Sequence, residues 1–335
     1  MNGKRNDGAR GGSALRFVRG AIASGALAAL LLSSSPAMIY ASSDAATGKG
    51  SVHSQTQNVN NNFLYPGVTI ADGKISYKLP GINSKNIWSY KALNLTVGGK
   101  KLTYPALSIN STVYVPLREA ASAIGAKVSY SSSSRTMTVS APGLLMTATD
   151  GGYVTYANGR TLFSFSPNVI MSNGRMYIAA STFAKATGLT LSHTSSSASL
   201  GGTLKPILSA DKYYKEDEVF WLARIITAEA KGESLLGQIA VGNVIMNRVA
   251  SRQYPNTIYG VIFDRKWGVQ FSPVLDGSIY NTPTYTATLA AKIILEGTKL
   301  SNDSLFFLNP LTAESNWIVK SREYLYTIGG HDFYS

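Results

Sequence analysis

The sequence contains no cysteine, and this absence excludes several classes of protein. No disulfide framework can form, so the chain must be held together by burial of apolar side chains. A cysteine peptidase and a metal site built on thiolates are excluded for the same reason. Histidine is scarce as well, with three residues among 335, so a zinc site has few imidazole ligands available. We therefore expect no metal and no other cofactor.

Long apolar runs are missing too. The run near the N-terminus, residues 21–32, has 12 residues, which is well short of the roughly 20 that span a bilayer. Five Lys or Arg precede it, and a Ser-rich stretch with Pro36 and a small-residue cleavage site ending at Ala41 follow. This pattern predicts a secretory signal peptide over residues 1–41, with an uncleaved anchor as the alternative.

Acidic residues are few in the middle of the chain. Residues 42–210 carry 14 Lys or Arg and 4 Asp or Glu, so this segment holds +10 of the formal net charge of +13, whereas residues 211–335 carry −1. For an exported chain, the positive segment fits anionic cell-wall polymers as a partner, and nucleic acid is not expected. Solubility alone is the alternative explanation of the excess charge.

The segment before the helical part is expected to be β-rich. Residues 42–66 are polar and predict a disordered linker. In residues 67–204, short runs of Val, Ile, Thr and Tyr alternate with turn pairs such as Asn158-Gly159, as in hairpins. Two stretches, 113–125 and 176–188, resemble each other, and each predicts a short strand and a short helix that ends at glycine.

After a linker at residues 205–215, the character becomes helical. We expect a helix that begins at residues 216–218, a buried helix over 236–250, and a helix from Thr284 to Glu296, followed by short strands over 305–308 and 316–319. Asn243 and Asn247 interrupt the buried helix, and they either bond neighbouring backbone or contact a substrate. The fold class is thus multidomain, with a β-rich α+β module before a mainly helical α+β domain over 216–335.

Glu229 is the residue that suggests chemistry. It follows Leu222, Ile225 and Ile226 at helical spacing, so its carboxyl leaves the helix toward the core side. No basic residue lies one turn before it, so partial burial should raise its pKa, as a general acid near neutral pH requires. The alternative is a surface glutamate on a frayed last turn, because Gly232 ends the helix nearby.

The β-rich segment resembles the domain named after the N-terminal region of copper amine oxidases. The resemblance rests on Tyr-Val-Pro-Leu-Arg at 114–118, Gly-Ala-Lys-Val-Ser-Tyr at 125–130 and Arg-Thr-Met-Thr-Val at 135–139, and it covers residues 92–140 best. It implies a binding or spacing module. Copper is not implied, because His193 is the module's single histidine and is interpreted as a surface residue.

The C-terminal segment resembles the catalytic domain of the SleB and CwlJ family of spore cortex-lytic cell wall hydrolases. The blocks that carry the resemblance occur in order through residues 216–335: Leu-Ala-Arg-Ile-Ile-Thr-Ala-Glu-Ala-Lys-Gly-Glu at 222–233, Gly-Gln-Ile-Ala-Val-Gly-Asn-Val-Ile-Met-Asn-Arg at 237–248, 254–262, Gln-Phe-Ser-Pro-Val at 270–274, Asn309-Pro310, Trp317 and His-Asp-Phe-Tyr at 331–334. The resemblance implies a lysozyme-like fold, peptidoglycan glycan strands as the partner, and Glu229 as the catalytic acid.

The same resemblance implies lytic transglycosylation, in which one glutamate serves as acid and then base. It further implies a glycan site lined by Gln270, Phe271, Ser272, Asn309 and Trp317, and aromatic residues such as these, or Tyr326, either stack on sugars or pack in the core. Glu233, Asn247 and His331 are expected to support the site, with direct catalysis by Glu233 as a minority interpretation and a structural role for His331.

Three alternatives remain open at the sequence level. An amidase needs about three metal ligands, whereas the helical domain has one histidine, His331. A muramidase differs in its product, and a non-catalytic wall-binding protein would explain the basic module. We expect a secreted monomer, associated with the cell wall or the spore. The choice between spore cortex and vegetative wall as substrate stays open.

Overall fold

The computed structural model describes residues 68–71, 74–77, 90–266, 268–313 and 316–335. The predicted signal peptide and the linker at 42–66 lie outside the described residues. Of the described helices, none combines the length and apolarity needed to cross a bilayer.

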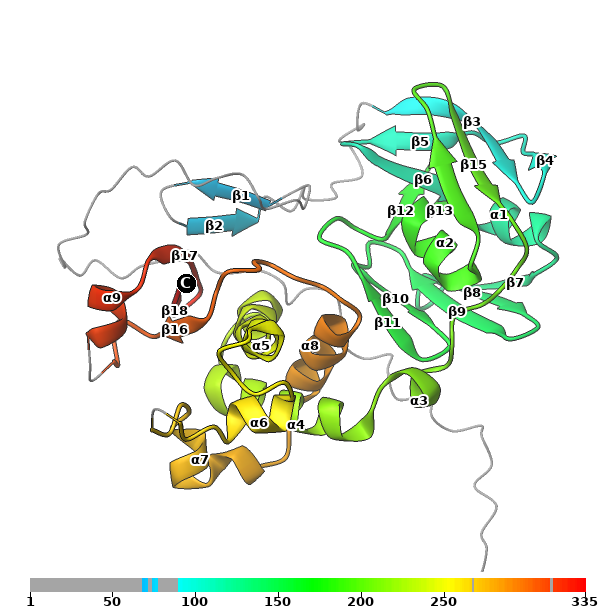
Figure 1. The fold of residues 1–335 in the computed structure, drawn as a ribbon. Helices are drawn as coiled ribbons and strands as arrows, with labels where there is room; N and C mark the ends of the chain where they lie inside the picture. The colour runs from blue at the N-terminus through cyan, green and yellow to red at the C-terminus, as the bar shows by residue number, and fades with distance from the viewer. Residues whose placement is uncertain (1–67, 72–73, 78–89, 267, 314–315) are drawn as a thin grey trace, which may run out of the picture. The chain divides into compact units, whose positions relative to one another are not determined.

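The β-rich segment forms two sheets (Figure 1). The larger has eight strands in the order β12-β13-β6-β5-β3-β15-β14, with β4 beside β3, and all pairs are antiparallel except β15 with β3. Its strands are β3 (Lys91–Val97), β4 (Lys100–Lys101), β5 (Ala106–Ile109), β6 (Thr112–Pro116), β12 (Val169–Ser172), β13 (Arg175–Ala179), β14 (Thr190–His193) and β15 (Ser197–Gly201).

The second sheet is an antiparallel meander in the order β11-β10-β9-β8-β7. Its strands are β7 (Lys127–Ser131), β8 (Thr136–Ala141), β9 (Leu144–Thr149), β10 (Val154–Ala157) and β11 (Arg160–Phe163). Buried and exposed residues alternate along β9, because successive side chains of a strand point to opposite faces. We call residues 91–201, with both sheets, the β module.

The two similar stretches of sequence form similar structures, as predicted. In the first, β6 leads into helix α1 (Leu117–Ala123), and in the second, β13 leads into α2 (Ala180–Thr187). Gly188 ends α2 in the left-handed region at φ 74°, and a Cβ there would collide with the backbone carbonyl of Lys205. Glycine is therefore required at this turn by both conformation and space.

The C-terminal part, residues 210–335, is built on three packed helices, α4 (Glu216–Ala230), α5 (Leu235–Ala250) and α8 (Tyr285–Leu295). We call it the helical domain. Ser234 and Thr284 cap α5 and α8 by accepting backbone N–H groups. A Cβ at Gly242 would collide with Ile294, so glycine permits the close approach of α5 to α8. Shorter helices complete the set: α3 (Ala210–Tyr213), α6 (Ile258–Ile262), α7 (Pro273–Asp276), the 3-10 turn η1 (Ser278–Tyr280) and α9 (Trp317–Ser321).

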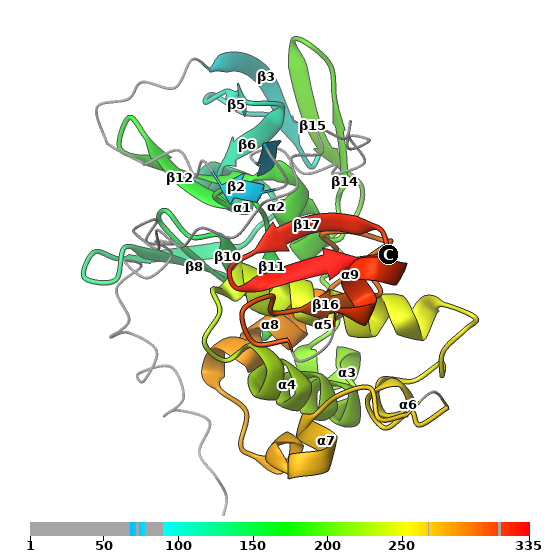
Figure 2. The same cartoon turned by 90° about the vertical axis from the view of Figure 1, so that its left-hand side faces the viewer.

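A small sheet accompanies these helices, and Figure 2 shows its strands β17 and β18 side by side. Its order is β1-β2-β17-β18-β16, from β1 (Val68–Ala71), β2 (Lys74–Tyr77), β16 (Phe306–Leu308), β17 (Tyr324–Ile328) and β18 (His331–Tyr334). Strands β1 and β2, expected in the β-rich segment, join this sheet instead, because β2 pairs with β17 and β1 pairs with β2. The strand expected over 316–319 is wrong, because residues 317–319 belong to α9, which follows Asn316, and Ser321 Oγ donates to the Trp317 carbonyl there.

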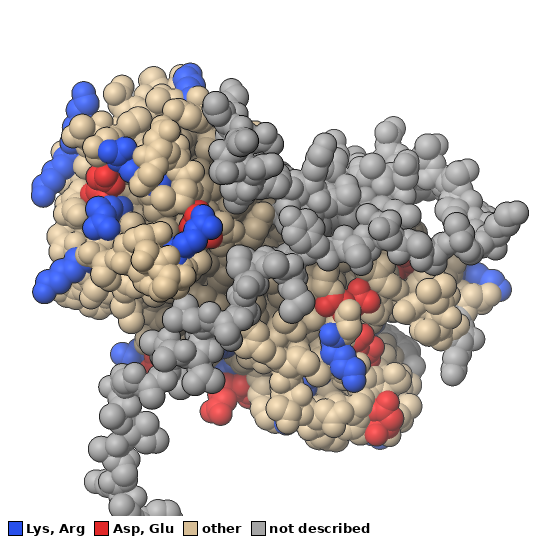
Figure 3. Space-filling model, turned by 180° about the vertical axis from the view of Figure 1, so that it is seen from behind, with Lys and Arg blue, Asp and Glu red and all other residues tan. Residues whose placement is uncertain are grey.

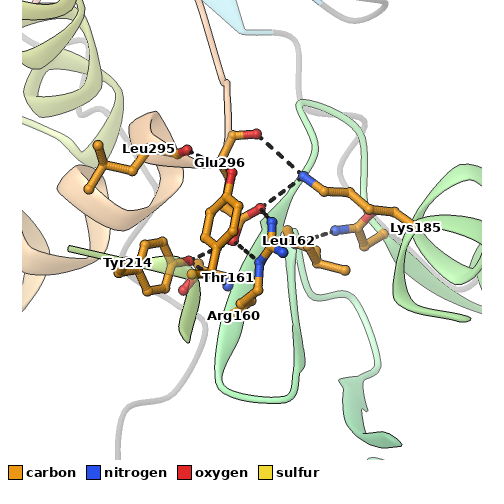
Figure 4. A network of polar contacts seen from close by, with 9 residues as sticks. Arg160, Thr161, Leu162, Lys185, Tyr214, Leu295 and Glu296 are labelled. Atoms are coloured by element: carbon orange, nitrogen blue, oxygen red, sulfur yellow. Dashed lines mark hydrogen bonds and ion pairs between the residues drawn. The ribbon is translucent and has the colours of Figure 1, made fainter. Parts of the chain in front are cut away.

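Glu296, at the end of α8, binds polar side chains of the β module (Figure 4). Its carboxylate accepts two hydrogen bonds from Arg160 at 2.8 and 2.7 Å, and Lys185 Nζ lies 2.9 Å away. Tyr214 donates to the same carboxylate at 2.7 Å. Burial by itself would raise the pKa of Glu296, but these donors outweigh it and lower the pKa. Beside this network, Phe165 of the β module is buried within the core of the helical domain.

The basic side chains of the β module are mostly exposed (Figure 3). The exposed ones among the described residues are Lys91, Lys100, Lys101, Arg118, Lys127, Arg135 and Lys185. The described acidic residues of the module are Glu119 and Asp150, and both lie within ion-pair distance of an arginine. Positive charge therefore dominates the surface of this module.

Candidate active site

Glu229 lies in the last turn of α4, next to the buried residues Leu222, Ile225 and Ile226 of the same helix. Its side chain is half-buried, as its helical phase predicts. Burial, and to a smaller extent the nearby carboxylate of Asp276, raises the pKa of Glu229 from 4.5 to about 7. A carboxyl group with this pKa is protonated in a large fraction of molecules near neutral pH, so it can donate a proton there.

Asp276 is a neighbour of Glu229 that the sequence alone does not reveal. It ends α7, which packs against α4. Its Oδ1 accepts a hydrogen bond from the backbone N–H of Ser278 at 2.7 Å, and the bonds from Ser278 lower the pKa of Asp276. The residue is exposed and stays ionised. The sequence signal that points to this short helix is local. Pro273 begins the helix, and Gly277, in the left-handed conformation, ends it after Asp276.

Glu233 points toward the turn between β17 and β18. Its carboxylate accepts from the backbone N–H of Gly330 at 3.2 to 3.3 Å, and His331 Nδ1 lies 3.7 Å from it. A Cβ at Gly330 would be 3.4 Å from Asn309 Nδ2. Three predicted residues, Glu233, Asn309 and His331, therefore gather around this turn. The contacts fit the expected supporting role of Glu233 better than direct catalysis.

His331 is buried, and burial lowers its pKa, so the ring is neutral at neutral pH. Its Nδ1 has no hydrogen-bond partner among the described residues. The imidazole packs edge-on against Phe307, with ring centroids 5.4 Å apart. The structural role of His331 stays a prediction.

The loop before α7 holds three predicted glycan-binding residues, and they differ in accessibility. Gln270 is half-buried, and its Oε1 accepts from Arg248 Nη1 at 3.4 Å. Ser272 is exposed at the start of α7. Phe271 is 3% exposed within the core of the helical domain. The expectation that Phe271 contacts the glycan is therefore corrected, since its ring faces cannot reach a sugar.

The remaining predicted residues are distributed around the domain. Asn247 is buried and donates to the backbone carbonyls of Ser301 and Ser304 at 3.0 Å. Of the two interpretations of this residue, the one in which its side chain bonds backbone is therefore observed. Asn309 Oδ1 accepts from Leu311 N, which fixes its local turn. Trp317 is 52% exposed on α9, with its ring 5.8 Å from that of Phe306. Trp317 thus keeps an accessible surface, unlike Phe271.

No group of three or more His, Cys, Asp or Glu side chains that could hold a metal ion occurs within the described residues.

The chain is similar to known cell wall hydrolases. The Cell Wall Hydrolase family pattern matches residues 232–334, and that of the copper amine oxidase N-terminal domain matches residues 96–200. The spore cortex-lytic enzyme of Bacillus cereus is 40% identical over 120 residues, 36% of this chain and 45% of that enzyme. The spore cortex-lytic enzyme of Halalkalibacterium halodurans is 39% identical over 120 residues, 36% of this chain and 35% of that enzyme. The chain thus spans less than half the length of these relatives.

Among solved structures, the catalytic domain of the germination-specific lytic transglycosylase SleB from Bacillus anthracis is similar, with 40% sequence identity and a TM-score of 0.33. The match covers 36% of this chain and 97% of that domain. The cell wall hydrolase CwlJ of Oceanobacillus iheyensis is 31% identical over 103 residues, which cover 29% of this chain and 72% of that protein. This chain belongs to the SleB and CwlJ cell wall hydrolase family.

Family membership rests on these sequence identities. In this SleB- and CwlJ-type chain the matched family pattern begins at residue 232, after Glu229, so the assignment of Glu229 as the candidate acid depends on its helical position and burial. The β module is matched over more residues than the 92–140 that its sequence motifs suggest.

Proposed function

We propose that this chain degrades peptidoglycan by cleaving the β-1,4 bond from N-acetylmuramic acid to N-acetylglucosamine, with Glu229 as the single acid and base. The half-buried carboxyl group of Glu229, whose pKa is raised to about 7, is the observation that carries the proposal. The relatives named spore cortex-lytic enzyme support peptidoglycan as the class of substrate.

The reaction proceeds in two proton transfers. The protonated carboxyl group of Glu229 donates to the glycosidic oxygen as the bond from muramic C1 to that oxygen breaks. The carboxylate then takes the proton of the muramic C6 hydroxyl as O6 attacks C1. The products are a 1,6-anhydromuramic end and a free N-acetylglucosamine 4-hydroxyl. No water is consumed, and Glu229 returns to its protonated form.

A muramidase is the second candidate, and Asp276 favours it. Ordinary glycosidases place a second carboxylate near the acid, either as a nucleophile or as a base for water. Asp276 is ionised, and it lies close enough to Glu229 to raise the pKa of that residue. In this variant of the mechanism, water attacks C1 and the product is a reducing muramic end.

The wider setting of the enzyme is part of the same proposal. A lysozyme-like fold would present Glu229 to the glycan, and Gln270, Ser272, Asn309 and Trp317 would bind it. The exposed Lys and Arg of the β module would bind anionic wall polymers. The predicted signal peptide supports secretion, and the protein is proposed to act as a monomer. The names of the relatives favour spore cortex as the substrate.

Fragment analysis tests this proposal. Purified cortex and vegetative peptidoglycan are digested with the protein, and the soluble products are identified by mass spectrometry. We expect anhydromuropeptides, with more product from cortex. Reducing muramic ends would replace the proposal by the muramidase, and free peptides by an amidase. Absence of fragments from both substrates would leave a wall-binding protein.

A further inference from the structure

Five aromatic rings gather on one side of the helical domain, around Trp221 of α4. The ring of Trp221 makes edge contacts with Phe220, Tyr259 and Phe263 at centroid distances of 5.0 to 5.2 Å, and with Tyr280 at 6.3 Å. Several of these side chains remain open to solvent: Tyr280 is 62% exposed, Tyr259 53% and Phe220 43%. We call these five residues the aromatic patch.

Packing in the hydrophobic core does not explain why these rings are exposed. A ring that serves the core is buried, as Phe271 is, whereas the patch keeps three rings accessible. The arrangement is also fixed in place. Arg224 Nη1 donates to the carbonyls of Ile279 and Asn281 at 3.3 and 2.8 Å, and its guanidinium lies 4.3 Å from the centre of the Phe220 ring. Arg224 thus ties the turn that carries Tyr280 to α4.

The patch continues toward Glu229 along α4. Trp221, Arg224 and Ala228 are half-buried and recur at helical spacing, so they lie on one face of the helix. Glu229 follows Ala228 directly. The segment from α7 to η1 packs along α4, with Asp276 near Glu229 at one end and Tyr280 near Trp221 at the other. From Trp221 to Glu229 the helix rises about 12 Å.

We propose that the aromatic patch is a second glycan subsite, in which Tyr280 and Tyr259 stack on sugar rings of the strand whose bond is cut at Glu229. This inference rests on the proposed function and extends it to residues outside the glycan site predicted from the sequence. A glycan strand is the occupant because α4 carries both the patch, at Trp221, and the candidate acid, and the segment from α7 to η1 reaches from one to the other. Tyrosine also suits a sugar, since its ring offers an apolar face and its hydroxyl a polar edge.

The subsite makes binding dependent on strand length. A short oligomer that occupies only the positions around Glu229 does not reach the patch, because the two lie about 12 Å apart along the helix. A longer strand contacts both. Loss of one stacking ring should therefore weaken the binding of long strands about three- to tenfold and leave that of the shortest strands unchanged.

The test is a binding titration on the full chain with Glu229→Gln, so that no strand is cut. Peptide-free glycan strands of defined length are titrated while intrinsic tryptophan fluorescence is followed, and the series is repeated with Tyr280→Ala or Tyr259→Ala added. Tyr130→Ala is the matched control, because Tyr130 is 43% exposed on the β module. Circular dichroism and thermal unfolding show whether each variant keeps its fold.

We expect a length-dependent loss for both patch variants and none for Tyr130→Ala. Equal affinity of all variants for long strands would overturn the proposal, as would an equal loss at every length. A patch that joins two copies of the chain would also overturn it, seen as a wild-type dimer in sedimentation that Tyr280→Ala dissociates. Failure of the Glu229 assignment is separate, because it appears as cleavage of the titrated strands by Glu229→Gln, which mass spectrometry of the same samples detects. Strands that stay intact leave the binding comparison valid.

Discussion

Replacing Glu229 by Gln should stabilise the protein at high pH. In the folded protein the pKa of Glu229 is about 7, against an ordinary value of 4.5. A tenfold difference in proton affinity corresponds to about 1.4 kcal/mol, so the folded state disfavours the ionised carboxylate by about 3 kcal/mol. Glutamine fills the same space and cannot ionise. The variant therefore escapes this penalty.

The sign of the effect follows from the order of ionisation. Below pH 4.5 the carboxyl group is protonated in the folded and unfolded chains alike, and the wild type carries no penalty. As pH rises from 4.5 to 7, the unfolded chain ionises first, so the free energy of unfolding of the wild type falls. Above pH 7 the loss is complete. The gap between Glu229→Gln and the wild type should grow by about 3 kcal/mol between pH 4 and pH 8.

Urea unfolding of both proteins at a series of pH values measures this gap. Its change with pH is the relevant quantity, since any constant difference between Glu and Gln cancels. Glu216→Gln is the control, because Glu216 is an exposed carboxylate in the first turn of the same helix. A gap for Glu229→Gln that stays constant from pH 4 to pH 8 would refute the burial of this carboxyl group.

Three further predictions concern Asp276, Glu296 and Gly329. Asp276→Asn should lower the pKa of Glu229 and so move the alkaline limb of the kcat/KM profile to lower pH. This shift should be smaller than the pKa shift that burial causes. An unmoved limb would contradict the electrostatic interaction between the two carboxyl groups. Glu296→Ala leaves a buried cation unpaired and should cost about 3 to 5 kcal/mol in urea unfolding, whereas a loss below about 1 kcal/mol would mean that the network is not formed. Gly329→Ala forces alanine to φ 59° and against the carboxylate of Glu233, so thermal unfolding should show a loss above about 2 kcal/mol, and wild-type stability would show that this turn is free to move.

Much of the fold could be predicted because local signals agree with the structure. The acidic first turn at 216–218, the Thr284 cap and the apolar helix before Ala250 each determine an element through hydrogen bonding or burial. Turn pairs such as Asn158-Gly159 have positive φ, which few other residues adopt. These signals act within one turn of the chain, so one sequence is enough to read them.

The predictions that were wrong or missed concern residues whose structure depends on contacts with distant segments of the chain. Residues 316–319 have the composition of a strand, yet they form a helix, because no neighbouring strand pairs with them in the described part of the chain. Phe271 stands in a polar loop, but tertiary packing buries it. Asp276 is 47 residues from Glu229, and only the packing of α7 on α4 brings them together. Sequence spacing carries no information about such contacts.

The central claim is that Glu229 supplies the proton that cleaves the glycan. The direct measurement compares the rate at which wild type and Glu229→Gln release soluble fragments from purified peptidoglycan at pH 6, after circular dichroism shows that both are folded. The account predicts a loss of about 10²- to 10⁴-fold or more for Glu229→Gln, because positioned acid catalysis contributes at least this factor. Release of fragments by Glu229→Gln at the wild-type rate would contradict it.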